Sequence, residues 1–323
     1  MEVSEIRGRK DLPMKYTLWI TGASGQLGRM LASIFIDNEC KLVLTDLKKD
    51  CDNNIHPLDI TSPENIDKFL CQTYPRPDIL INCAAITNVD GCETDKESAD
   101  KVNNLAAGLL AAKSFNFCLP MIQISTDFVF DGEQTNPYLE TDQPNPLSVY
   151  GTTKRLGEVA VRSQNFFYYI LRTAWLYSEF GKNFVKTMLK LSQTKDQIFV
   201  VNDQTGSPTY AYDLALAIKE IVDRYFDSKK IPFGTYHFTN SGVATWFDLA
   251  TEAIKLFGSD TLVVPQSTND YYIKMNAGKV IVQRPKYSVL NCQKITSVLG
   301  HSSRDWQEAL AECISKIKST SLD

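Results

Sequence analysis

The sequence is poor in the features that mark metal-binding, nucleic-acid-binding and membrane proteins. It has only three histidines, and its eight cysteines form no Cys-x-x-Cys pair, which disfavours a zinc site. No long run of lysine or arginine occurs and the formal net charge is −4, so neither a nucleic acid nor an anionic membrane surface is an expected partner. No apolar stretch approaches the length of a membrane span. We therefore expect no required metal ion and no nucleic-acid or membrane partner.

The N-terminus lacks the apolar segment of a secretory signal peptide. It reads "MEVSEIRGRKDLPMK", which is charged, and we interpret residues 1–13 as a flexible tail. Cys83 and Cys118 lie inside apolar runs, where buried free thiols are expected. Free thiols without a disulfide framework are typical of a reducing compartment, so the sequence predicts a cytoplasmic protein.

Strand-like and helix-like segments alternate in the first half of the chain. Apolar runs that predict strands occupy residues 15–20, 41–46, 78–85, 120–126 and 166–172. Helical spacing of apolar residues, or a helix-capping pattern, marks the segments between them, at 26–38, 62–72, 95–115 and 148–163. Alternation of this kind is typical of βαβ units. It predicts an α/β protein with a doubly wound, Rossmann-like parallel sheet over residues 14–173.

After residue 173 the pattern becomes less regular. Short strand candidates, "QIFVV" and "GTYHFTN", separate helical stretches at 183–194, 210–226, 245–257 and 304–318. We expect residues 174–323 to form mainly a smaller, mixed α/β substrate-binding lobe. This arrangement also allows the chain to cross back into the first domain.

A glycine-rich turn follows the first predicted strand. The segment "TGASGQLG" places Gly22, Gly25 and Gly28 three residues apart, between a strand and a helix. Glycine allows close approach of a pyrophosphate to the backbone, and the N-terminus of the following helix offers free N–H groups. The GxxGxxG spacing resembles that of the short-chain dehydrogenase/reductase superfamily. The turn predicts a dinucleotide site, with contacts from Gly22, Ser24, Gly25, Gln26 and Leu27.

Asp46 ends the second predicted strand, 24 residues after Gly22. An acidic residue at this place accepts hydrogen bonds from the adenosine ribose, which favours NAD. Lys48 and Lys49 follow directly and could neutralise a 2′-phosphate, so NADP stays open. The expected cofactor is therefore NADPH or NADH.

Two further segments are expected beside the cofactor. In "LDI", Asp59 could meet the adenine amino group, with Ile60 next to it. In "NCAA", Ala84 and Ala85 end the third predicted strand, where the chain would pass the dinucleotide.

Tyr150 and Lys154 form a Tyr-x-x-x-Lys motif at the start of the predicted helix 148–163. Residues four apart lie on one helix face. An ammonium beside the phenol lowers its pKa from about 10, so that the tyrosine can act as acid and base near neutral pH. Thr126 ends the fourth predicted strand, at the sheet edge where ligands bind, and its hydroxyl could hydrogen-bond a substrate carbonyl. We predict that Thr126, Tyr150 and Lys154 are catalytic.

The chain resembles the dTDP-4-dehydrorhamnose reductases, which are extended short-chain reductases. The resemblance runs through almost the whole chain after the tail. It rests on the order and spacing of "TGASGQLG", "INCAAITNVDGCE", "VNNLAAGLLA", "STDFVFDG", "PYLETDQPNPLSVYGTTKRLGE", "LRTAWLYSEFGKNFVKTML", "VVNDQTGSPT", "GTYHFTNSGVATWFDLA" and "QRPKYSVLN".

The resemblance implies reduction of the C4 ketone of dTDP-4-dehydro-L-rhamnose to dTDP-L-rhamnose, with a nucleotide sugar as substrate. It places Asp127, Phe128 and Trp175 around the sugar. Phe128 departs from the tyrosine that the family often carries, which removes one hydrogen bond to the sugar. Arg284 in "QRPKYS" could face the diphosphate, since a guanidinium pairs well with phosphate, and a structural ion pair is the equal alternative. Some relatives bind magnesium at a dimer interface. We find no match for those ligands here, and a homodimer is an open expectation.

Three alternatives compete with this interpretation. A sister reductase would act on a UDP-linked or acetamido sugar. A 4,6-dehydratase would carry glutamate after Thr-Asp, where this chain has Phe128. The regulatory subunit of methionine adenosyltransferase also resembles this family and binds the cofactor without turning over sugar. The presence of Thr126, Tyr150 and Lys154 favours catalysis.

Overall fold

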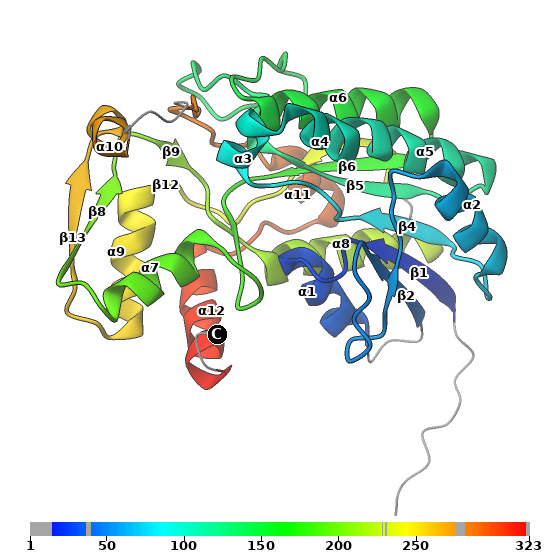
Figure 1. Cartoon of the computed structure of the whole chain (residues 1–323), viewed down its shortest axis with the longest axis horizontal. Helices are drawn as coiled ribbons and strands as arrows, with labels where there is room; N and C mark the ends of the chain where they lie inside the picture. Colours follow the sequence, from blue (N-terminus) through cyan, green and yellow to red (C-terminus); the bar gives the residue numbers. More distant parts are fainter. Residues whose placement is uncertain (1–14, 37–39, 228, 230, 276–281, 321–323) are drawn as a thin grey trace, which may run out of the picture.

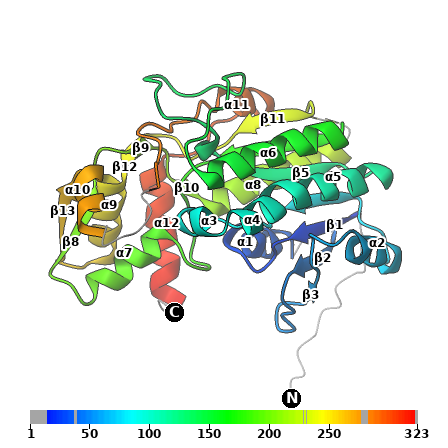
Figure 2. The same ribbon diagram turned by 45° about the horizontal axis from the view of Figure 1, so that its top comes forward.

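The fold is a parallel sheet covered by helices on both faces, with a smaller lobe at one side (Figure 1, Figure 2). The computed structural model describes residues 15–36, 40–227, 229, 231–275 and 282–320. The tail predicted for residues 1–13 lies outside these residues.

The seven strands of the main sheet run in the order β11-β6-β5-β4-β1-β2-β3, and all neighbours are parallel. The sheet starts in its middle with β1, and the chain moves first to β2 and then across β1 to β4. Loops that follow β1 and β4 therefore diverge at the carboxyl edge, where open α/β sheets bind ligands. The bounds are β1 Tyr16–Thr21, β2 Cys40–Asp46, β3 Ile55–Pro57, β4 Ile79–Asn82, β5 Met121–Thr126, β6 Tyr168–Thr173 and β11 Gly234–His237.

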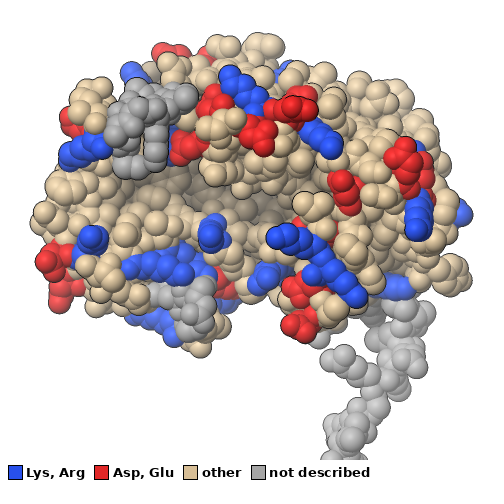
Figure 3. Space-filling model, viewed as in Figure 1, with Lys and Arg blue, Asp and Glu red and all other residues tan. Residues whose placement is uncertain are grey.

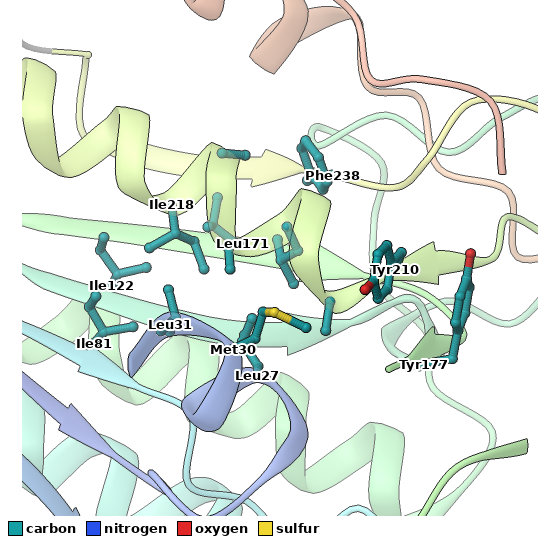
Figure 4. Packing of buried hydrophobic residues seen from close by; sticks show 14 of the residues in the cluster. Leu27, Met30, Leu31, Ile81, Ile122, Leu171, Tyr177, Tyr210, Ile218 and Phe238 are labelled. Carbon is teal, nitrogen blue, oxygen red and sulfur yellow. The ribbon is translucent and has the colours of Figure 1, made fainter. Parts of the chain in front are cut away.

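Alternation of side chains along the strands builds two hydrophobic layers. Leu18 and Ile20 of β1 are fully buried in one cluster, which includes residues of α1 and α8 (Figure 4). Trp19, between them, points to the other face and packs with residues of α2, α5 and α6. Both faces of the sheet are thus dry, as expected for continuous apolar strands. The flanking helices are α1 Gln26–Phe35, α8 Ala211–Phe226 and α11 Gln293–Leu299 on the first face, and α2 Pro63–Gln72, α5 Ala106–Asn116 and α6 Val149–Gln164 on the second.

The long helix predicted over 95–115 is interrupted. It consists of α4 (Lys96–Asp100), a π-helical turn (Lys101–Leu105) and α5, and the short helix α3 (Val89–Thr94) precedes it. The turn buries Asn103, whose amide donates to the Ile86 carbonyl and to Thr153 Oγ1 at 3.0 and 3.2 Å. α6 packs closely on this turn, since a methyl group at Gly157 would lie 2.1 Å from the Asn103 carbonyl oxygen. Tertiary hydrogen bonds, which apolar spacing does not show, account for the interruption.

The smaller lobe has its own apolar cluster, in which Met188, Ile198 and Ile254 are buried. Its elements are α7 Phe184–Ser192, β8 Gln197–Val201, α9 Trp246–Phe257, β13 Leu262–Gln266 and α10 Thr268–Met275; α12 Trp306–Thr320 packs against α9, and the short pairs are β7 Leu176–Tyr177 with β10 Thr209–Tyr210 and β9 Thr205–Gly206 with β12 Ala244–Thr245. Among the described residues, no helix combines the length and the apolar character needed to cross a membrane.

The chain returns from the smaller lobe to the sheet. The segment "GTYHFTN", predicted as a strand of the second half, contains β11, which pairs with β6 at the edge of the main sheet. α8 packs against α1 on the sheet. The doubly wound α/β fold is confirmed, while the boundary at residue 173 stays a prediction.

The expectation that Cys118 is buried is wrong. Cys118 is exposed. It lies at a turn between α5 and β5, where its φ is +56°. The Cys118 N–H donates to the Phe115 carbonyl at 3.0 Å, so the chain turns outward before the apolar run of β5 begins.

Candidate active site

A cavity of about 530 Å³ lies at the carboxyl edge of the sheet and extends to the smaller lobe. The space-filling view shows a largely uncharged hollow in this face of the molecule, with lysine and arginine side chains along its lower rim (Figure 3). Most of the predicted site residues line this cavity: Gly22, Gly25, Gln26, Leu27, Ala85, Thr126, Asp127, Phe128, Tyr150, Lys154, Trp175 and Arg284. The predicted residues that are not part of its lining are Ser24, Asp46, Asp59, Ile60 and Ala84.

The three glycines of the turn after β1 have different physical roles. Gly22 has φ +64°, and a methyl group there would lie 2.6 Å from the Ala84 backbone nitrogen, in the loop after β4. A methyl at Gly28 would lie 2.3 Å from the Gly22 carbonyl oxygen. At Gly25, by contrast, the only described atom within 4 Å is that same oxygen, at 3.2 Å. The protein's own packing requires Gly22 and Gly28, while Gly25 faces open space.

The N-terminus of α1 is free to receive an anion. Gly25 is its N-cap and supplies no side-chain cap, and the first turn contains no acidic residue. Backbone N–H groups and the positive end of the helix dipole therefore face the cavity beside Gly25.

Asp46 lies at the outer edge of the glycine turn. Its Oδ2 accepts hydrogen bonds from the Ser24 hydroxyl and backbone N–H at 2.6 and 3.0 Å, and its Oδ1 accepts from the Leu47 N–H at 2.7 Å. The end of β2 is thus tied to the turn after β1. Its predicted role at the adenosine ribose stays a prediction, as does that of Ser24.

Asp59 is engaged by its own turn. The Thr61 hydroxyl and N–H donate to Asp59 Oδ1 at 2.7 and 2.9 Å, and these bonds hold the pKa of the carboxyl below its usual range. Ile60 is buried in the cluster beneath α2 and α5. Both residues have a structural role at the start of α2, and their predicted cofactor contacts stay predictions.

Tyr150 lies in the first turn of α6. Ser148 caps this helix by accepting from the Gly151 N–H at 3.1 Å, and a methyl at Gly151 would lie 2.2 Å from the Phe128 carbonyl oxygen. α6 therefore begins directly against the turn that follows β5. The Tyr150 ring is 9% exposed and meets Phe128 edge-on, with centroids 5.6 Å apart.

The expected lowering of the Tyr150 pKa is not what the structure shows. Burial raises the pKa, a hydrogen bond with the Thr126 side chain opposes this rise, and the Asp127 charge adds to it. Lys154, expected to stabilise the phenolate, donates from Nζ to the Ile124 carbonyl at 2.7 Å. Burial lowers the pKa of Lys154 to about 8, with the nearby Glu158 carboxylate acting in the opposite direction.

Thr126 and Asp127 form a buried polar pair at the end of β5. Thr126 Oγ1 donates to Asp127 Oδ1 at 3.0 Å and accepts from the Phe128 N–H at 3.2 Å. Asp127 is 1% exposed, and burial raises its pKa to about 6, while the nearby Ser288 and Thr126 side chains act in the opposite direction. Its Oδ2 has no hydrogen-bond partner among the described residues. This carboxyl group lines the cavity with one acceptor unused.

A buried ion pair holds the elements that carry Thr126 and Lys154 together, and sequence reasoning missed it. Glu158, one turn after Lys154, accepts from Arg172 Nε and Nη2 at 2.8 Å each, and from the Ser125 hydroxyl at 2.7 Å. These bonds tie α6 to the ends of β5 and β6, next to Thr126. Glu158 of "RLGE", Arg172 of "LRTAWLY" and Ser125 of "STDFVFDG" each belong to a motif of the sequence analysis, but nothing in the sequence pairs them.

The smaller lobe supplies the opposite wall of the cavity. Trp175, just after β6, stacks on Trp246 of α9 with centroids 3.7 Å apart and an interplanar angle of 7°. Trp246, Asn183 and Phe184 line the cavity and were not singled out from the sequence, although each falls within a quoted motif. Arg284 also lines the cavity.

The structure shows the ion pair that was one of the two interpretations of Arg284. Its Nη2 pairs with Asp90 at 3.2 Å, while its buried Nε has no hydrogen-bond partner among the described residues. The ion pair leaves one donor of the guanidinium available, and a contact with a substrate diphosphate stays a prediction.

Comparison with known proteins gives the family. Residues 14–319 match the family model described as RmlD substrate binding domain. The chain belongs to this family. It is 36% identical over 299 residues to a dTDP-4-dehydrorhamnose reductase of Aggregatibacter actinomycetemcomitans, which covers 91% of this chain and 96% of the relative.

Two solved structures support the same assignment. A dTDP-4-dehydrorhamnose reductase of Clostridium acetobutylicum has a TM-score of 0.83 and 39% identity, over 94% of this chain and 99% of that one. A dTDP-4-dehydrorhamnose reductase of Bacillus anthracis, solved in complex with NADP, has a TM-score of 0.81 and 32% identity, over 93% and 99% of the two chains. The predicted family is confirmed.

Within the described part of the chain, no group of three or more histidine, cysteine, aspartate or glutamate side chains is arranged to hold a metal ion. The expectation that no metal is required stays a prediction.

Proposed function

We propose that this protein is an NADPH- or NADH-dependent reductase that converts dTDP-4-dehydro-L-rhamnose into dTDP-L-rhamnose. The observation that carries the proposal is the gathering of Thr126, Tyr150 and Lys154 in one cavity with the glycine turn. Membership of the RmlD family supports the substrate, since reductases named for this sugar are similar over almost the whole chain.

The residues around the glycine turn fit a dinucleotide. Gly25 leaves open space over the uncapped N-terminus of α1, and the Asp46 carboxylate lies at the end of the next strand. The solved relative from Bacillus anthracis, which is in complex with NADP, supports a dinucleotide cofactor. The bound cofactor would supply a hydride from its nicotinamide ring.

Tyr150 would protonate the alkoxide that forms when the ketone is reduced. Its raised pKa suits this role, because the phenol stays protonated at neutral pH until a stronger base forms beside it. Lys154, with a pKa of about 8, is mostly an ammonium at neutral pH and lies on the same face of α6, so it would stabilise the phenolate left behind. Thr126 would hold the oxygen in place, and the free Oδ2 of Asp127 would accept a sugar hydroxyl.

The proposed activity is tested by mixing the purified protein with NADPH and dTDP-4-dehydrorhamnose and following cofactor absorbance. We expect oxidation of NADPH that depends on the sugar. Cofactor binding without oxidation would favour the regulatory-subunit alternative. Oxidation with a UDP-linked keto sugar, but not with the dTDP sugar, would revise the substrate and keep the chemistry.

Tyr150→Phe tests the proton donor. Removal of the hydroxyl should lower kcat by about 100-fold or more, the usual contribution of a positioned general acid, and leave the Kd for NADPH nearly unchanged. Tyr138→Phe is the matched control, because its hydroxyl binds Asp131 away from the cavity. Wild-type turnover in Tyr150→Phe would refute the assignment.

A further inference from the structure

Thr126 has a single hydroxyl proton, and in this structure Asp127 receives it. Thr126 Oγ1 donates to Asp127 Oδ1 at 3.0 Å, and the Phe128 N–H donates to Thr126 Oγ1 at 3.2 Å. An ionised carboxylate can only accept, so the direction of the first bond is fixed while Asp127 carries its charge. The Thr126 hydroxyl then has no proton left for a substrate carbonyl, which is the role that the sequence predicts for it.

Rotation of the Thr126 hydroxyl toward the substrate would leave a buried charge poorly satisfied. Asp127 is 1% exposed, and its Oδ2 has no hydrogen-bond partner among the described residues. If Thr126 turned away, the ionised carboxylate would lose the bond to Oδ1 as well. A buried charge that loses its hydrogen bonds is costly, so rotation alone is an unfavourable solution.

A proton on Asp127 removes this conflict. The protonated carboxyl donates to Thr126 Oγ1, whose two lone pairs then accept from Asp127 and from the Phe128 N–H. The Thr126 proton is released toward the cavity, and Asp127 Oδ2 remains an acceptor for a sugar hydroxyl. Burial favours the protonated form, because it raises the pKa of Asp127 to about 6.

The groups around Asp127 decide how this pKa changes when the cavity is filled. Tyr150 faces Asp127 from α6, and the Asp127 charge raises the pKa of the phenol. The Ser288 side chain lies near Asp127 and opposes the rise of its pKa. NADPH and a nucleotide sugar bring negative phosphates and displace water, so both raise the pKa of Asp127 above 6 in the complex. The cationic side chains in the cavity lining, which act against the phosphates, are Lys154, Lys182 and Arg284.

We propose that Asp127 is a positioning residue whose protonated form donates to Thr126 and so turns the Thr126 hydroxyl toward the ketone oxygen of the substrate. The proposal rests on the proposed function, which places a keto sugar in this cavity. A hydroxyl that accepts one hydrogen bond becomes a stronger donor in the next, so the chain from Asp127 through Thr126 also polarises the ketone. Tyr150 remains the group that protonates the alkoxide.

The pH profile of a single turnover tests this role. With NADPH and the keto sugar bound, the wild-type rate should fall about tenfold for each pH unit above the pKa of Asp127 in the complex, since only the protonated form releases the Thr126 proton. Asp127→Asn should lose this decline, because a neutral amide can donate at every pH. A separate decline, from loss of the Lys154 ammonium with its pKa of about 8, should remain in both proteins.

Asp131→Asn is the matched control. Asp131 lies four residues further along the same segment, and its carboxylate accepts from Tyr138 and Asn145 outside the cavity lining. This variant should keep the wild-type pH profile. Loss of the Asp127 decline in Asp131→Asn would overturn the assignment, because it would show that any change in this segment removes the decline.

Thr126→Val tests whether Asp127 acts through Thr126. Valine keeps the branched shape of threonine and lacks the hydroxyl, so the slower single turnover of this variant should show no decline from Asp127. Adding Asp127→Asn to Thr126→Val should then leave the pH profile unchanged. A decline that persists in Thr126→Val and disappears in the double variant would overturn the route through Thr126.

Infrared spectroscopy detects the proton without turnover. The complex with NADP⁺ and the keto sugar cannot transfer a hydride, so it accumulates. In the pH range where single turnover is fastest, the wild-type complex should show the C=O band of a protonated carboxyl, and the Asp127→Asn complex should lack it. An Asp127 that stays ionised in this range would overturn the proposal.

The outcomes separate this proposal from the proposed function. A wild-type protein that does not oxidise NADPH with the keto sugar at any pH overturns the function. An active wild-type protein whose pH profile is the same in Asp127→Asn, and whose complex lacks the carboxyl band, overturns the role of Asp127 alone. If Asp127→Asn does not fold, the wild-type band and the Thr126→Val profile still decide the question.

Discussion

The two ends of the cavity are built by different means. At the end proposed to bind the cofactor, backbone packs on backbone: Gly22 lies against the loop after β4, and Gly28 lies against the Gly22 carbonyl. At the end proposed to bind the sugar, side chains make the wall, and Trp175 stacks on Trp246 from the smaller lobe. The Gly22–Ala84 contact joins backbone segments 62 positions apart and the Trp175–Trp246 stack joins side chains 71 positions apart, so the two ends differ in the kind of contact and not in its sequence separation.

This difference bears on what each end can tolerate. A backbone-on-backbone contact cannot relax, so any side chain there disturbs the fold itself. A side chain in a wall of stacked rings can be substituted without a large loss of stability, so the main loss is in ligand affinity. We therefore expect substitutions at the cofactor end to affect stability most, and those at the sugar end to affect binding.

Gly28→Ala should have the largest effect. The added methyl would lie 2.3 Å from the Gly22 carbonyl oxygen and 2.6 Å from the Ala23 Cα, both fixed backbone atoms. We expect a loss of about 3 kcal/mol in the free energy of unfolding, at the upper end of overpacking costs, together with loss of NADPH binding. Denaturant unfolding measures the first and fluorescence titration the second. A variant as stable as the wild type would contradict the packing role.

Gly25→Ala is the matched control within the same turn. Its methyl would meet one described atom, at 3.2 Å, and would project into the open space beside α1. We expect little change in Tm and an increase of about tenfold in the Kd for NADPH, because the methyl would occupy space that the pyrophosphate needs. An unchanged Kd would show that the cofactor does not approach this face of the turn.

Asp127→Asn should have the smallest effect of the three substitutions in free energy, and its effect on stability should be opposite in sign to that of Gly28→Ala. Because burial raises the pKa of Asp127 from 3.8 to about 6, its protonated form favours folding below pH 4, and this contribution is lost as the pH rises through about 6. The neutral amide should therefore gain stability relative to the wild type between pH 4 and 7, by about 1 kcal/mol. Thermal unfolding across this range, with KM for the sugar measured beside it, checks the gain and its cost in binding. A stability difference that does not change with pH would contradict the raised pKa.

The regular part of the fold could be predicted because its signals are local. Five apolar runs became β1, β2, β4, β5 and β6, and the strand-helix contexts of the glycine turn and of Tyr150 were correct. The strand β3 and the paired strands of two residues are too short to show an alternation of apolar and polar residues. They are defined only by their pairing with other strands, which the sequence does not reveal. α11 is likewise only seven residues long.

The candidate site could be predicted where its residues lie close together in the sequence or at the ends of neighbouring strands and helices. Tyr150 and Lys154 share a helix face, and Thr126 ends the neighbouring strand. The ion pair of Glu158 with Arg172 and the Trp175–Trp246 stack escaped prediction, because each joins side chains from separate elements. The direction of the Tyr150 pKa shift was also predicted wrongly. Burial raises this pKa, and the burial of a side chain depends on the packed structure.

The return of β11 to the main sheet has a consequence for how the chain can be divided. A fragment that ends at residue 173 would lack α8, whose Leu214 and Ile218 are fully buried, and would leave the edge of β6 unpaired. Such a fragment would expose an apolar sheet face and an open strand edge, which together favour aggregation. The smaller lobe therefore cannot be exchanged by cutting at one point. A chimaera that carries another sugar specificity has to replace several separate inserts while keeping α8 and β11 in place.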